Sequence, residues 1–448
     1  MLPKRISLIA TSILFLATSL MMTSWYARKI DPAVVSYMSI PTALRAILDF
    51  SVLGKPLATP DPTHFLVSLA ALSNDEITLE TVPSVAGSLP SATGYGLGAN
   101  KTSNSAKLVK PNSHLPTTLP LASPLTSVVS SPIALGWTLG VTPATLPTLL
   151  AQSPGLTVLA PKWLHVSGPY GAVSGTINEQ VVQMCHARGI KVWAVVDNGF
   201  SASETHAYLS YADRQTALIH HLVTLAKQYH LDGLNLDFEG LANADRWNYT
   251  HFVQQLATAL RPHHVALSVD LPPDIIYGQN NGPYNHAALA KVVSKIVLMG
   301  YDQHWGGDPY AGPTASLPWV STGIKDMLIT GVPSQKLVLG MPLYTQDWTL
   351  SKQGTVLNSQ PLSLQQLQNL VSQVHAVPHW DAALGVHVLR YVVQGTIHEI
   401  WMEDERSLML LADLIPKDHL AGGAVWYLGL SSPTLWQSLV DTLHTAIG

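Results

Sequence analysis

The segment 231–240, LDGLNLDFEG, holds the residues whose types and spacing could do chemistry. Asn235, Asp237 and Glu239 occupy every second position between apolar residues. Alternate side chains of a β-strand point to the same face, so these three should lie side by side. Two carboxyl groups this close repel each other when both are ionised, which raises the pKa of one of them.

A carboxylic acid that stays protonated near neutral pH is what a general acid requires. The alternative interpretation of this segment is a solvated acidic strand end. An inward row of polar side chains in an otherwise apolar strand is costly to keep for packing alone. We therefore expect acid–base catalysis from this strand.

Eight short β-rich runs must position these residues, and helix-like segments lie between most of them. Buried strands that alternate with helices predict an α/β fold of the (β/α)8, or TIM, barrel type. A doubly wound open sheet is the alternative. A barrel takes about 250 residues, so 131–448 leaves room for a small α+β insertion, expected between strands seven and eight at 349–415. The eight runs are 133–140, 155–163, 189–200, 231–240, 264–273, 295–305, 336–344 and 422–430.

The carboxyl ends of these runs, where a barrel of this type has its active site, carry aromatic and polar side chains. Aromatic faces stack on sugar rings, and carboxylates and amides hydrogen-bond sugar hydroxyls. One tryptophan at a strand end could be mere packing, but several aromatics at matched ends indicate a carbohydrate site. Besides the three residues above, the strand ends carry Trp137, Trp163, Asp197, Asn198, Asp270, Tyr301, Asp302, Tyr344 and Trp426.

The stretch DGLNLDFE (232–239) resembles the signature of glycoside hydrolase family 18, written D-G-x-D-x-D-x-E. This is the family of chitinases and related N-acetylglucosaminidases. The likeness covers 131–448 and is closest to the bacterial subgroup of spore-cortex and other cell-wall N-acetylglucosaminidases. Further stretches resemble the family's sixth-strand motif, seventh-strand motif and ending: LMGYDQHW (298–305), GMPLYTQDW (340–348), and TIHEIWMEDERSL (396–408) with AVWYLGL (424–430).

The resemblance implies a retaining, substrate-assisted mechanism, in which the N-acetyl oxygen of the substrate attacks the anomeric carbon. Glu239 would be the general acid and then the base, Asp237 would orient the acetamide, and Tyr301 would hydrogen-bond its oxygen. Trp426 would form the floor under the cleaved sugar. The predicted substrate contacts are Asn235, Asp302, Trp426, Tyr344, Trp163, Asn198, His304 and Trp305.

Asn235 stands where the family signature has its middle aspartate. An aspartate there can share a proton with Asp237 during the reaction, whereas an asparagine can only hydrogen-bond. The cell-wall subgroup often has this residue, so we interpret the site as active. The predicted function is hydrolysis of β-linked N-acetylglucosamine glycans, with peptidoglycan of the cell wall or spore cortex favoured.

Three alternatives remain open at this stage. The first is a chitinase or chitooligosaccharide hydrolase with the same mechanism. The second is a non-catalytic chitinase-like carbohydrate-binding protein, although such proteins usually lose the acid that Glu239 provides here. The third is a sporulation-linked structural protein whose barrel is incidental.

Composition and charge exclude several other classes. The net charge of −4, without a basic run, argues against a nucleic-acid partner. A hydrophobic content of 47% excludes a disordered chain. The single cysteine, Cys185, excludes an intramolecular disulfide and any cysteine-based metal site. His375 and His379 have helical spacing, but Pro378 interrupts the helix between them, and we predict no metal and no cofactor.

The first 130 residues show none of these motifs. Lys4 and Arg5 precede an uncharged, apolar run over 6–25, which predicts a signal peptide or membrane anchor at 1–30. An uncleaved anchor is favoured because no clean A-x-A site follows. The glycan-cleaving part would then lie outside the cytoplasm, either tethered to the membrane or secreted.

Two further segments separate this leader from the barrel. Residues 31–80 are unassigned and have short, possibly helical, apolar patches. From Thr81 to Pro132 the chain has 10 Ser, 6 Thr and 7 Pro, and its only charges are three lysines. Such a segment cannot bury enough apolar surface to fold, so we predict a Ser/Thr/Pro-rich linker at 81–130.

Overall fold

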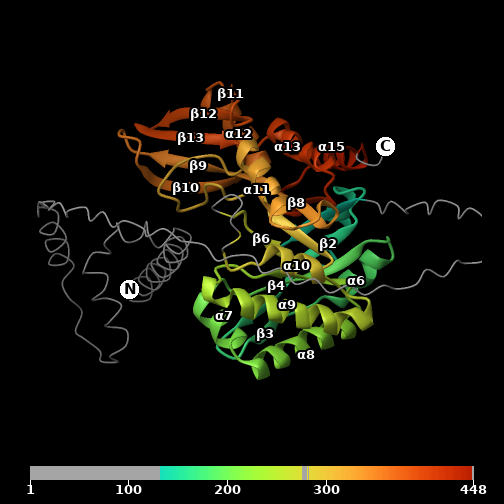
Figure 1. The fold of residues 1–448 in the computed structure, drawn as a ribbon. Coiled ribbons are helices and arrows are strands. Elements are labelled where there is room, and N and C mark those ends of the chain that lie inside the picture. The colour runs from blue at the N-terminus through green and yellow to red at the C-terminus, as the bar shows by residue number, and fades with distance from the viewer. Residues whose placement is uncertain (1–131, 275–279, 281, 446–448) are drawn as a thin grey trace, which may run out of the picture. The chain divides into compact units, whose positions relative to one another are not determined.

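The computed structural model describes residues 132–274, 280 and 282–445, drawn as a coloured ribbon in Figure 1. The predicted leader at 1–30, the segment 31–80 and the linker at 81–130 lie outside these residues. Among the residues that the structure describes, no helix is long and apolar enough to cross a membrane.

Eight parallel strands form a closed barrel, and its order β1-β14-β8-β7-β6-β5-β4-β2 is completed by pairing of β1 with β2. Each barrel strand overlaps one of the eight runs expected from the sequence, although β2 extends past 155–163 to Ser167. The closed barrel is therefore confirmed, and the open sheet is wrong. A short strand, β3 (Ala172–Gly175), pairs antiparallel with β2. The barrel strands are β1 (Ile133–Thr138), β2 (Val158–Ser167), β4 (Lys191–Asp197), β5 (Gly233–Asp237), β6 (Ala266–Leu271), β7 (Lys295–Met299), β8 (Leu337–Pro342) and β14 (Gly422–Trp426).

Helices between the strands cover the outside of the barrel (Figure 1). Several begin at a side chain that accepts a backbone N–H of the first turn, as Asn178 does for α6 and Asp404 for α13. The helices are α5 (Leu146–Ala151), α6 (Glu179–His186), α7 (Ala202–Leu209), α8 (Ala212–Gln228), α9 (Arg246–Leu260), α10 (His286–Val292), α11 (Leu317–Ile329), α13 (Glu405–Ala412), α14 (Leu414–Lys417) and α15 (Pro433–Thr445).

The alternation of side chains along β5 divides the core in two. Leu234, Leu236 and Phe238 are buried in the layer between the strands and the helices. A second cluster, which includes Trp137 and Tyr301, fills the inside of the barrel. The apolar residues of 231–240 therefore face the helices, opposite to the inward row of polar residues, as the alternation predicted.

A five-stranded antiparallel sheet stands between β8 and β14, where the sequence predicted an α+β insertion. It has a small core of its own, around Leu367, Leu389 and Ile400. The last part of the predicted range 349–415 contains α13, which packs against α15 and β8 of the barrel. The insertion consists of β9 (Tyr344–Leu350), β10 (Val356–Ser363), α12 (Leu364–Val374), β11 (His379–Asp381), β12 (Val386–Val393) and β13 (Thr396–Met402).

Three hydrogen bonds tie the insertion to the loop that follows β7. The indole Nε1 of Trp348 donates to the backbone oxygen of Gly312 at 2.9 Å. The backbone N–H of Gly307 donates to the hydroxyl of Ser359 at 3.1 Å. Next to β13, Glu403 accepts from the backbone N–H of Ala315 at 2.9 Å. The insertion and the loop therefore support each other.

Glu403 is fully buried at this junction, and the hydroxyl of Ser407 lies 3.2 Å from its carboxyl group. Burial raises the pKa of Glu403 to about 8 from its ordinary value of 4.5. The folded protein therefore keeps this proton at neutral pH, while the unfolded chain releases it.

This difference predicts how stability changes with pH. The free energy of unfolding contributed by Glu403 is fully present below about pH 4.5 and is lost as the pH rises to about 8. Glu403→Gln keeps the shape but has no proton to release, so its melting temperature should fall less between these pH values than that of the wild type. Calorimetry across this range checks the prediction, with Glu405→Gln on the exposed side of α13 as control. Equal pH dependence in Glu403→Gln and the wild type would contradict it.

Candidate functional site

A cavity of about 470 Å³ opens at the carboxyl ends of the barrel strands. Of the catalytic residues and substrate contacts predicted from the sequence, five line it: Glu239, Asp237, Tyr301, Asp302 and Trp426. Trp137 and Asp270, both expected at strand ends, line it too, and its wall also contains Lys162, Phe200, Asp274, Trp319 and Asp326.

The end of β5 brings the two central carboxyl groups to this cavity. Asp237 is the last residue of the strand, and Glu239 follows it by two positions. Between them the ring of Phe238 is buried on the outer face and stacks on Phe252 at a centroid distance of 5.9 Å. The hydroxyl of Tyr284 donates to the backbone oxygen of Phe238 at 2.8 Å. Packing of Phe238 thus fixes the direction of its two acidic neighbours.

Asn198 holds the backbone of Glu239 from the neighbouring strand end. Its Nδ2 donates to the backbone oxygen of Glu239 at 2.8 Å, and its Oδ1 accepts the backbone N–H of Glu239 at 2.9 Å. Asn198 is fully buried and does not line the cavity. The sequence predicted a sugar contact for Asn198, whereas the structure places it as a support beneath Glu239.

Asn235 lies inside the barrel, also without lining the cavity. Its Oδ1 accepts from the indole Nε1 of Trp137 at 2.8 Å. Its Nδ2 donates to the hydroxyl of Ser268 at 2.9 Å and to Oδ1 of Asp270 at 2.6 Å. Both ends of the amide are therefore engaged, and its orientation is fixed by the chemistry of its partners.

The rings above Asn235 form an aromatic group at the cavity. Trp137 meets Trp426 at a centroid distance of 5.9 Å and Tyr301 at 6.4 Å, both edge to face. The peptide bond between Trp426 and Tyr427 is cis. Burial raises the pKa of Tyr301 well above its ordinary value, so its hydroxyl remains a hydrogen-bond donor at neutral pH.

Burial raises the pKa of three aspartates that line the cavity: Asp237, Asp270 and Asp274. Burial raises the pKa of Asp237 to about 6, although the Lys162 ammonium lowers it and the Asp197 charge raises it further. Burial raises the pKa of Asp270 well above its ordinary range, and the charge of Asp237 adds to the effect. The sequence predicted charge repulsion between Asp237 and Glu239. The structure adds a second repulsion, between Asp237 and Asp270.

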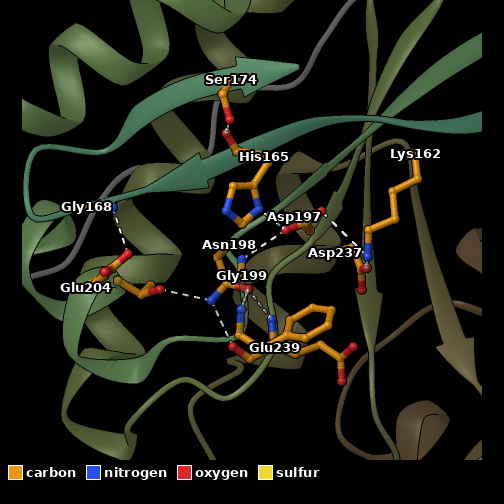
Figure 2. A network of polar contacts seen from close by, with 12 residues as sticks. Lys162, His165, Gly168, Ser174, Asp197, Asn198, Gly199, Glu204, Asp237 and Glu239 are labelled. Atoms are coloured by element: carbon orange, nitrogen blue, oxygen red, sulfur yellow. Dashed lines mark hydrogen bonds and ion pairs between the residues drawn. The ribbon is translucent and has the colours of Figure 1, made fainter. Parts of the chain in front are cut away.

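Lys162 and His165 complete a polar network that sequence reasoning missed (Figure 2). The Nζ of Lys162 lies 3.5 Å from Oδ2 of Asp197 and 3.8 Å from Oδ2 of Asp237. The Nδ1 of His165 lies 2.5 Å from Oδ1 of Asp197, which also accepts the backbone N–H of Gly199 at 2.9 Å.

Regular alternation along the first part of β2 explains why Lys162, and not Trp163, faces the inside of the barrel, and a bulge follows at Trp163. The pairing of β2 with β4 shifts register between Lys162 and Leu164. Trp163 and Leu164 both pack on the outer side, against the core beneath the helices, and Trp163 does not line the cavity. Counting by twos from Val158, which faces the inside of the barrel, was the signal that could have found Lys162.

The other predicted contacts lie around the cavity rather than in it. The hydroxyl of Tyr344 donates to the Asp302 carboxylate, which does line the cavity. The Nδ1 of His304 lies 3.1 Å from Oδ2 of Asp308, within the loop after β7. His304, Trp305 and Tyr344 are not among the lining residues.

Asp274, His286 and Asp326 form the one group of three or more ligand-type side chains in the described part of the chain whose atoms come within 4.8 Å of one another. Carboxylates and an imidazole are suitable ligands for several divalent cations. Here Asp274 accepts from Asn280 at 3.1 Å and hydrogen-bonds Asp326, while the Nδ1 of His286 lies 2.7 Å from the Thr330 hydroxyl. These contacts join the cluster to its neighbours, and the absence of a metal stays a prediction.

Comparisons with known proteins agree with this geometry. The chain is 26% identical over 281 residues to an uncharacterized glycosylase of Bacillus subtilis, YvbX, covering 60% of this chain and 80% of that protein. It is 29% identical over 253 residues to the cortical fragment-lytic enzyme of Bacillus anthracis, covering 55% of this chain and 58% of the relative.

Solved structures show the same fold. A chitinase from Chromobacterium violaceum matches with a TM-score of 0.62 and 25% identity, over 70% of this chain and 99% of the other. The spore cortex-lytic enzyme SleL of Bacillus megaterium matches with a TM-score of 0.62 and 24% identity, over 69% of this chain and 73% of the other.

The decisive comparison is with a whole family. Residues 165–430 match the family described as Glycosyl hydrolases family 18. This range is more than half of the 448 residues and contains both Asp237 and Glu239. The chain therefore belongs to glycosyl hydrolase family 18 and is a glycoside hydrolase.

Proposed function

We propose that this enzyme cleaves β-linked N-acetylglucosamine glycans with retention of configuration, and that peptidoglycan is its substrate. The observation that carries the proposal is the placement of Glu239 and Asp237 in one cavity, beside Tyr301 and Trp426. The names of two similar proteins, a cortical fragment-lytic enzyme and a spore cortex-lytic enzyme, support peptidoglycan as the substrate.

The proposed first step transfers a proton from Glu239 to the glycosidic oxygen as the bond to the anomeric carbon breaks. The acetamide oxygen of the same sugar attacks that carbon, which gives a cyclic oxazolinium ion without an enzyme nucleophile. In the second step Glu239 takes a proton from water while the water oxygen attacks the anomeric carbon. The ring opens, the acetamide is restored, and the two inversions leave the configuration retained.

The neighbours of Glu239 serve the acetamide in this proposal. The Asp237 carboxylate accepts the acetamide N–H and stabilises the positive charge that develops on the ring. The Tyr301 hydroxyl donates to the acetamide oxygen and aims it at the anomeric carbon. The ring of Trp426 lies beneath the sugar, held edge to face by Trp137.

Chitin is the second candidate substrate, and the charge of the cavity favours it. Six carboxyl groups line the cavity against the single ammonium group of Lys162 among the described lining residues: Asp237, Glu239, Asp270, Asp274, Asp302 and Asp326. An acidic cavity favours an uncharged glycan over one that carries free carboxylates. Membership of the family argues against the non-catalytic sugar-binding protein that the sequence left open, and so does the retention of Glu239 and Asp237.

An extracytoplasmic location is proposed from the basic and apolar run within 1–30. The full chain produced in a bacterium should then fractionate with the membrane or outside the cell, and a chain lacking 1–30 should stay in the cytosol. The same cytosolic distribution for both chains would overturn this proposal.

The role of Glu239 can be tested with the full-length wild type and its Glu239→Gln variant. Each protein is incubated with peptidoglycan and, separately, with chitin oligomers, and the products are identified by mass spectrometry. Loss of the acid should lower turnover by about 100-fold or more while sugar binding remains. Glu179→Gln, on an exposed helix turn, is the matched control and should cleave normally.

Each outcome of this experiment has one meaning. Muropeptides with an N-acetylglucosamine reducing end, from the wild type alone, support the peptidoglycan proposal. Chitin products alone keep the mechanism and change the substrate. No product from either glycan, with binding retained, would overturn both proposed substrates.

The role of Asp237 predicts a pH-dependent rate. Because the pKa of Asp237 is about 6 and its carboxylate is the working form, kcat/KM should fall as the pH drops below about 6. Asp237→Asn should lower the rate by about 100-fold and remove this acidic limb. An unchanged rate would contradict the acetamide-orienting role. The control is Asp213→Asn, exposed in the first turn of α8.

A further inference from the structure

We propose that Lys162 is a positioning residue, which holds the Asp237 side chain as an oriented carboxylate by placing an ammonium charge beside it. The proposal rests on the proposed function of the cavity. It differs from the resemblance described above, in which Asp237 shares a proton with an aspartate at position 235. Here that position is Asn235, and charge compensation by Lys162 takes the place of proton sharing.

Asn235 cannot take the role of a proton-sharing aspartate beside Asp237, and its amide forms hydrogen bonds with other residues. Its oxygen accepts from Trp137, and its nitrogen donates to Ser268 and Asp270. An amide also has no proton to share at neutral pH. A nearly buried carboxylate that has lost this possibility needs another source of stabilisation, since burial alone favours its neutral form.

The ammonium group of Lys162 is that source. It lies 3.8 Å from Oδ2 of Asp237 and 3.5 Å from Oδ2 of Asp197. The side chains of Asp237 and Asp197 are 9% and 8% exposed, while that of Lys162 is 28% exposed. The contact therefore lies at the boundary of the cavity, where solvent screens the attraction only in part.

Asp197 anchors the ammonium independently of Asp237. Its Oδ1 is occupied by the His165 ring and the backbone N–H of Gly199, which leaves Oδ2 facing Lys162. The bulge at Trp163 makes this possible, because it turns both Lys162 and His165 to the same side of β2 (Figure 2). Lys162 is thus fixed from one side and acts on Asp237 from the other.

Several other titratable groups act on Asp237 or on its partners. Asp197 opposes ionisation of Asp237, and Asp270 is coupled to Asp237 by repulsion. His165 acts through Asp197. The groups that surround Asp237 are Lys162 and His165 on β2, Asp197 on β4, Glu239 after β5, Asp270 on β6, and the buried tyrosines Tyr249, Tyr284 and Tyr301.

The test compares the full-length wild type with Lys162→Met and Lys162→Arg. The carboxyl carbon of Asp237 is followed by ¹³C NMR over a pH titration, with Asp237→Asn used to assign its signal. Loss of the ammonium should raise the pKa of Asp237 above its value of about 6, and Lys162→Arg should restore it. Lys191→Met, at the exposed start of β4, is the control and should leave the titration unchanged.

Kinetics give the second measurement, on whichever glycan the wild type cleaves. The acidic limb of kcat/KM should move to higher pH in Lys162→Met, so that activity near pH 6 falls by about tenfold for each unit that the limb moves. Activity near pH 8 should change much less. If Lys162 only bound substrate, KM would rise with the limb unchanged, and this result would overturn the proposal.

The two measurements separate this proposal from the proposed function. If the wild type cleaves neither glycan, the function fails, but the NMR titration still decides the role of Lys162. An unshifted Asp237 titration in a folded Lys162→Met protein overturns the proposal. Melting temperatures verify folding, and Lys162→Gln, which keeps a polar side chain, replaces Lys162→Met if that variant does not fold.

Discussion

Carboxyl groups taken out of water at the mouth of a closed barrel are the constraint that shapes the rest of this site. Removing a carboxylate from water costs several kcal/mol, and the cost falls only when partners replace the lost hydration. Asp197, Asp237 and Asp270 are all buried. Each therefore requires a neighbour of the right chemistry, and the strands around them supply it.

The neighbours differ in kind from one carboxyl group to the next. Asp270 receives the neutral amide of Asn235, and Asp197 receives the His165 ring and a backbone N–H. Asp237 receives the charge of Lys162 at a longer distance. Asp237 is thus the least tightly held of the three carboxyl groups, and in the proposed mechanism it is the one that stabilises a developing positive charge. A fully satisfied hydrogen-bond set around Asp237 would leave it less able to engage a substrate.

The sequence was sufficient for the features that depend on local periodicity. The eight strands follow from short apolar runs, and Asp237, Glu239 and Trp426 follow from their places at strand ends. Regular alternation from Val158 would have placed Lys162 inside the barrel, whereas the position of His165 on the same side depends on a bulge that pairing with β4 creates. Trp319 reaches the cavity from α11. The sequence could not predict this contact, because it depends on how the long loop after β7 places that helix at the mouth of the barrel.

The hydrogen bonds between the insertion and the loop after β7 have a consequence for engineering and for the divergence of relatives. That loop carries Asp302 into the cavity wall, while Trp348, Ser359 and Glu403 supply its outer partners. If the insertion were shortened or transplanted, a hydrogen-bond donor or acceptor of that loop would lose its partner. The insertion and the loop after β7, whose contacting residues lie more than 30 positions apart along the chain, should therefore change together during evolution. Changes in the length of glycan that the wall accommodates should arise by exchanging both together.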